Sequence, residues 1–170
     1  MPGSNPSGKH GPNRFSNYRA IHDTVMEQYL RAGFVRPESL AFDDLGDGFI
    51  ELVGVIECVA GIYIDVYKRL VVLGGDGSHA LVQTVAYSYN AVLRGVGNIL
   101  RYDSPHPDHN QEHHRHRFDV FARREIKPPL FLPDEQQRPT LGEVIAEVER
   151  WYYEHLDRVH AHIVGDAPTA

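Results

Sequence analysis

The chain has 170 residues, of which 42% are hydrophobic, and this size predicts one domain with an apolar core. No run of about 18 apolar residues is present, so we expect neither a membrane-spanning helix nor a membrane partner. The net charge of −6 is not typical of a nucleic-acid-binding protein. The single cysteine, Cys58, excludes an internal disulfide and a CxxC zinc site, and it predicts a cytoplasmic protein.

The N-terminal part of the chain divides into a tail and a helix. Residues 1–14 contain mainly Gly, Pro, Ser and Asn, which predicts a disordered tail. Residues 17–33 carry apolar side chains at three- and four-residue steps, and Gly33 is a typical helix stop. We therefore expect the folded domain to begin with a helix.

The middle of the chain predicts a β-meander of about five strands. Alternating apolar and polar side chains, separated by short turns, place strands at residues 50–58, 62–72, 80–90, 99–103 and 113–121. Short links between consecutive strands favour antiparallel neighbours. The proline-bearing residues 123–139 are predicted to form an extended connector.

The C-terminal part predicts a second helix. Thr140 and Glu143 have the spacing of a capping box, and an apolar stripe follows from Leu141 to Val159. Packing both helices on the meander predicts an α+β domain over residues 15–162, with a flexible tail at 163–170.

The residues suited to chemistry concentrate on the last three predicted strands. Five of the eleven histidines fall between His106 and His116. Because hairpin links place these strands side by side, we expect a shared site formed by Tyr89, Arg101, Tyr102, Asp103, His114 and His116. Such a set can cleave RNA without a metal, since histidine acts as base or acid near neutral pH and arginine binds phosphate. Arg115, Arg117, Tyr87 and Lys68 are predicted to contact nucleic acid.

Two other interpretations of the histidines stay open. In a strand, His114 and His116 point the same way and can form a metal-ligand pair, which Asp103, His106 or His109 could complete. Alternatively, these imidazoles are half-buried and hydrogen-bonded to a loop. With no cysteine partner and no HExxH motif, we assign no metal and no cofactor.

Three motifs occur in a characteristic order: YSYN at 87–90, LRYDS at 100–104 and HHRHRFD at 113–119, followed by the closing helix. This order resembles the TumE-like toxin family of type II toxin–antitoxin systems over residues 49–153. Ser104 stands where the family often has Asn. The resemblance implies a growth-inhibiting toxin that a cognate antitoxin protein binds and silences.

The expected function is therefore a toxin that inhibits growth by acting on RNA as an endoribonuclease. His114 or His116 would serve as acid or base, Arg101 would hold the phosphate, and Tyr89 or Tyr102 would position a nucleotide. The rival functions are a non-catalytic module that binds nucleic acid or protein, and a metal-dependent hydrolase that uses the His-rich strand. The expected partners are the antitoxin and RNA, and a homo-oligomer is compatible with the residues.

Overall fold

The computed structural model describes residues 9–37, 39–109 and 111–165, which form an antiparallel sheet with three α-helices. The strands are β1 Asn13–Arg14, β2 Ala41–Asp44, β3 Phe49–Glu57, β4 Ile62–Gly74, β5 Leu81–Leu93, β6 Gly97–Asp103, β7 His114–Asp119 and β8 Arg124–Phe131, and the helices are α1 Phe15–Ala32, α2 Leu141–Glu154 and α3 Leu156–Gly165. The predicted α+β class is confirmed.

The sheet is a meander, as predicted, but it is larger than the predicted one. Strands follow one another in the order β2-β3-β4-β5-β6-β7-β8, and β1 adds to β5, so the described residues form eight strands in place of about five. The edge strand β8 occupies part of the predicted connector. Its prolines, Pro128 and Pro129, are compatible with an edge strand because an edge leaves backbone N–H groups unpaired.

The predicted tails fall only partly within the described residues. Residues 1–8 and 166–170 lie outside them. Asn13 and Arg14 pair with Val82 and Leu81 of β5, and α3 extends to Gly165. Within the described ranges, no helix is both long and apolar enough to cross a lipid bilayer.

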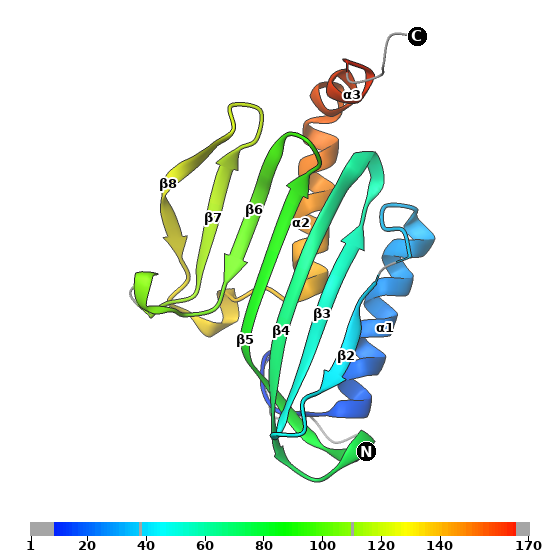
Figure 1. The fold of residues 1–170 in the computed structure, drawn as a ribbon, viewed down its shortest axis with the longest axis vertical. Coiled ribbons are helices and arrows are strands. Elements are labelled where there is room, and N and C mark those ends of the chain that lie inside the picture. The colour runs from blue at the N-terminus through cyan, green and yellow to red at the C-terminus, as the bar shows by residue number, and fades with distance from the viewer. Residues whose placement is uncertain (1–8, 38, 110, 166–170) are drawn as a thin grey trace.

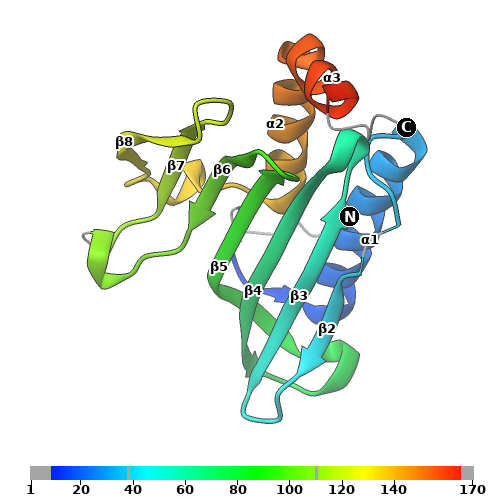
Figure 2. The ribbon, with the colours of Figure 1, turned by 45° about the horizontal axis from the view of Figure 1, so that its top comes forward.

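The helices α1 and α2 cover one face of the sheet (Figures 1 and 2). The core forms there because α2 turns its apolar stripe to the sheet, burying Val144, Ile145 and Val148 against side chains such as Ile64 and Tyr89. The opposite face of the sheet carries no α-helix in the described part of the chain. Because side chains alternate along each strand, every second side chain faces the α-helices and the others face the opposite side of the sheet.

The helix α2 begins with the predicted capping box. The Thr140 side chain accepts a hydrogen bond from the Glu143 backbone N–H, and the Glu143 carboxylate accepts one from the Thr140 backbone N–H. We expect Thr140→Ala to lower the free energy of unfolding by about 1 kcal/mol, because it leaves a helix N–H without its acceptor. Urea unfolding measures this loss. Ser78→Ala in an exposed turn is the control, and equal stability of the two variants would contradict the assignment.

Candidate metal centre

The register of β6 and β7 places two histidines on the face away from the helices. Asp103 pairs with His114, and Arg101 pairs with His116. The intervening pair, Tyr102 and Arg115, points to the other face, where both residues bond to α2. Because side chains alternate along a strand, the histidines must project from the face opposite α1 and α2.

The connection between β6 and β7 folds back over these histidines. It contains a short 3₁₀ helix, Pro107–His109, and it lies beside the outer strands (Figure 1). The ring centre of His109 is 4.3 Å from that of His114 and 5.1 Å from that of His116. As a result His114 is 0% exposed and His116 is 4% exposed, although no α-helix of the described part of the chain covers them. Burial lowers the pKa of His114, which favours its neutral form.

The hydrogen bonds of His114 define which nitrogen can bind a metal. Its Nδ1 lies 2.9 Å from the Glu112 carbonyl oxygen, and a carbonyl only accepts, so the proton of the neutral ring is on Nδ1. The lone pair is then on Nε2, which accepts a hydrogen bond from Nε2–H of His106 at 3.2 Å. A metal bound by both nitrogens would replace this hydrogen bond, because the neutral His106 ring can carry its proton on Nδ1 instead. Two nitrogen ligands of a tetrahedral zinc ion are separated by about 3.3 Å. These two imidazoles therefore already have the spacing of a ligand pair.

His109 completes a group of three imidazoles. Nitrogen atoms of His106, His109 and His114 all lie within 4.8 Å of one another. The second nitrogen of His106, Nδ1, lies 3.7 Å from a carboxylate oxygen of Asp108. A backbone carbonyl or carboxylate behind a ligating histidine is the usual arrangement that orients its ring toward a metal.

An overlapping group, Asp103, His114 and His116, also has ligand-like spacing, but its members already have partners. Asp103 accepts hydrogen bonds from Arg101 at 2.6 Å and from Ser88 at 2.7 Å. Nε2 of His116 lies 2.9 Å from an Arg101 nitrogen, which can only donate, so its lone pair is in use. The other nitrogen of His116, Nδ1, lies 2.5 Å from the Glu125 carboxylate, and this bond lowers the pKa of Glu125. We assign the metal ligands to the first group, because the hydrogen-bond partner of His114 there is an imidazole that can move its proton to its other nitrogen, whereas the guanidinium of Arg101 keeps its protons.

The other predicted site residues lie elsewhere. Tyr89 and Tyr102 are buried on the helix face, where the Tyr102 hydroxyl donates to Glu147 of α2 at 2.8 Å. Arg115 forms an ion pair with the same carboxylate. The sheet therefore separates these tyrosines from the histidines. Arg101 and Asp103 are the predicted partners that the structure brings to His114 and His116.

Tyr87, Lys68 and Arg117 complete the predicted residues. Tyr87 and Lys68 line a cavity on the helix face, and the Tyr87 hydroxyl lies 3.0 Å from Nδ1 of His113. Arg117 is exposed on β7. These three residues therefore do not share a surface with the buried imidazoles.

Two features of the site are not assigned from the sequence. His106 and His109 enter only as optional ligands, because a loop has no periodicity that predicts where its side chains point. Glu125 is missed because its strand, β8, falls within the predicted connector. The sequence feature that could have pointed to Glu125 is its position as an acidic residue among the basic residues Arg123, Arg124 and Lys127.

Together the fold and the site define an antiparallel α+β domain with a histidine cluster at one end of its sheet. No family model, curated protein or solved structure matches the chain.

Proposed function

We propose that this protein binds a divalent transition metal, with zinc as the best fit, through His106, His109 and His114, and that it is a metal-dependent hydrolase. The observation that carries the proposal is the convergence of one nitrogen from each of the three imidazoles within 4.8 Å, with Nδ1 of His114 held 2.9 Å from the Glu112 carbonyl oxygen. Neutral imidazoles suit zinc, and three protein ligands leave a fourth position for water.

The surroundings of the cluster suit catalysis better than a closed structural site. His106 and His109 are half-buried, so one side of the cluster faces solvent. A zinc ion held by these three histidines would supply a water molecule of lowered pKa as the nucleophile. Arg101, whose side chain is 36% exposed, has five N–H donors, and its bonds to Asp103 and His116 use two of them. The remaining donors favour a phosphodiester substrate, and RNA is the first one to test.

A second candidate is a metal-independent toxin that cleaves RNA, in line with the resemblance to TumE-like toxins. The supporting observation is the pair His116 and Glu125, because a carboxylate at Nδ1 orients an imidazole for proton transfer at Nε2. Arg101 donates to that nitrogen, and in this candidate it would turn from His116 to the phosphate, which frees Nε2 for proton transfer. Tyrosine assistance is not part of this candidate, since Tyr89 and Tyr102 lie across the sheet.

The test uses protein purified without a polyhistidine tag, which would bind metal itself. Elemental analysis is expected to find about one equivalent of zinc or another transition metal per chain. Total RNA is then incubated with untreated protein, with EDTA-treated protein, and with treated protein that has received zinc again. The hydrolase proposal expects cleavage that EDTA removes and zinc restores.

The outcomes separate the two candidates. Cleavage that survives EDTA and is lost in His116→Ala would replace the metal proposal with the acid–base one. Metal-free protein that gains no zinc on titration would refute the metal site. Controlled expression tests the toxin proposal in cells, because normal growth with intact RNA would exclude it.

A further inference from the structure

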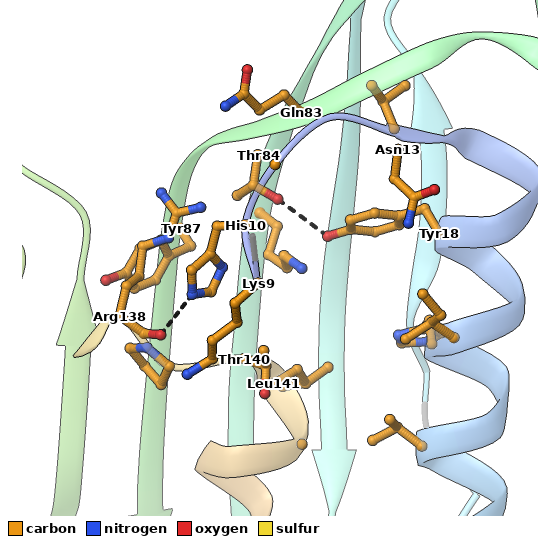
Figure 3. Close-up of a pocket in the computed structure, with 18 of the residues that line it drawn as sticks. Lys9, His10, Asn13, Tyr18, Gln83, Thr84, Tyr87, Arg138, Thr140 and Leu141 are labelled. Carbon is orange, nitrogen blue, oxygen red and sulfur yellow. Dashed lines mark hydrogen bonds between the residues drawn. The ribbon is translucent and has the colours of Figure 1, made fainter. Parts of the chain in front are cut away.

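A second site lies on the opposite, helix-bearing face of the sheet. A cavity of about 220 Å³ opens between α1, the start of α2 and the strands β4 and β5. Figure 3 shows Tyr18 of α1 facing Thr84 of β5, with Arg138 and Thr140 on the α2 side. The Tyr18 hydroxyl lies 3.3 Å from the Thr84 hydroxyl. A register shift between β4 and β5, at which Val85 is left out of the pairing, places Thr84 in this wall.

The charge of the cavity wall has one sign. Among the described residues that line it, Lys9, Lys68 and Arg138 are basic and none is Asp or Glu. Lys9 is balanced by Glu143, a residue outside the lining, at 2.6 Å. Arg138 is 5% exposed, and its guanidinium lies 5.8 Å from the centre of the Tyr87 ring. The first turn of α2, at Leu141 and Gly142, adds the positive end of a helix dipole, which the capping carboxylate of Glu143 partly offsets.

Lys68 is the residue that this wall leaves without a counter-charge. It is half-buried in the middle of β4, and its ammonium lies 4.6 Å from the centre of the Tyr18 ring. None of the ion pairs formed within the described part of the chain includes this ammonium. Removing an ammonium from bulk water costs free energy unless an anion or oxygen acceptors replace the water.

We propose that this cavity binds a small organic anion, whose acidic group pairs with Lys68 and whose apolar or aromatic body packs beside Tyr18 and Tyr87. The apolar part of the wall, which includes Ile21, Val25 and Leu141, supplies surface for that body. An ammonium in a partly desolvated wall forms a stronger bond to an anion than one in open water. The site is separate from the histidine cluster, which lies across the sheet.

The test measures binding of three probes by isothermal titration calorimetry: phenyl phosphate, benzoate and neutral phenol. Comparing the first two distinguishes a phosphate ligand from a carboxylate ligand. We expect saturable millimolar or tighter binding of at least one anion, and no comparable binding of phenol. Lys68→Met is expected to lower the affinity for the anion at least about tenfold, while Lys68→Arg retains most of the affinity. Lys127→Met, an exposed lysine on β8, is the matched control.

Chemical-shift mapping on the unmodified protein makes the result independent of how the variants fold. The anion is expected to shift the amide signals of Lys68, Thr84 and Gly142 and to leave those of His109 and His114 unchanged. Equal affinity of Lys68→Met and wild type, equal binding of phenol, or shifts confined to the histidine cluster would each overturn the proposal. None of these outcomes bears on whether zinc binds the histidines, which elemental analysis decides.

Discussion

Replacing His114 by alanine is expected to weaken zinc binding by at least about a hundredfold, the largest effect of any single substitution in the proposed centre. Replacing a residue that only orients a metal ligand lowers the metal affinity by up to about a hundredfold. The loss should be at least as large for His114, because it supplies the ligand atom itself. In the wild type, zinc at about a hundred times its dissociation constant should stabilise the fold by about 2.7 kcal/mol. His114→Ala should lose this stabilisation, which thermal unfolding with and without zinc measures.

The matched control is His79→Ala, which removes an exposed histidine from a turn far along the chain from the cluster. Its zinc affinity and its thermal shift should equal those of the wild type. If His114→Ala binds zinc as tightly as His79→Ala, the three-histidine assignment is wrong.

Glu125→Gln distinguishes the two overlapping ligand groups. Zinc bound by His106, His109 and His114 should tolerate this change, because Glu125 contacts only His116 among the clustered imidazoles. Zinc bound through His116 should weaken about 10- to 100-fold, since the carboxylate would then orient a ligand. Competition with a zinc-chelating dye measures both values.

The second large effect is expected at Glu147, whose carboxylate joins α2 to the outer strands. It accepts a hydrogen bond from Tyr102 of β6 at 2.8 Å and forms an ion pair with Arg115 of β7. Glu147→Ala leaves both donors without this acceptor at a site where the Arg115 side chain is 26% exposed. We expect the free energy of unfolding to fall by about 2–4 kcal/mol, below the cost for a fully buried pair.

Urea unfolding tests this expectation, with Glu154→Ala as the control on the exposed end of the same helix. The control should change stability by less than about 0.5 kcal/mol. Glu147→Gln keeps an oxygen acceptor and loses the charge. Its loss of unfolding free energy should therefore lie between those of Glu147→Ala and Glu154→Ala. A Glu147→Ala protein as stable as the control would show that the bonds of Glu147 make no net contribution to the free energy of unfolding.

Local patterns in the chain are enough to predict much of the fold. Apolar alternation locates β3 to β7, and the spacing of Thr140 and Glu143 marks the start of α2. These features depend on side chains only a few residues apart, so the sequence displays them directly. The short strand β2 and the proline-bearing β8 escape prediction, because their pairing depends on a neighbouring strand more than on their own residues.

The composition of the histidine-rich stretch is visible in the sequence, but its geometry is not. Strand parity alone places His114 and His116 on one side. The helices pack on the face that carries the tyrosines, and this packing separates the tyrosines from His114 and His116. The fold of the β6–β7 connection places His106 and His109 over the strand β7. The sequence by itself determined the elements and their alternation. Only the tertiary structure decided which face became buried and which side chains share a site, because those outcomes depend on packing between segments far apart in the chain.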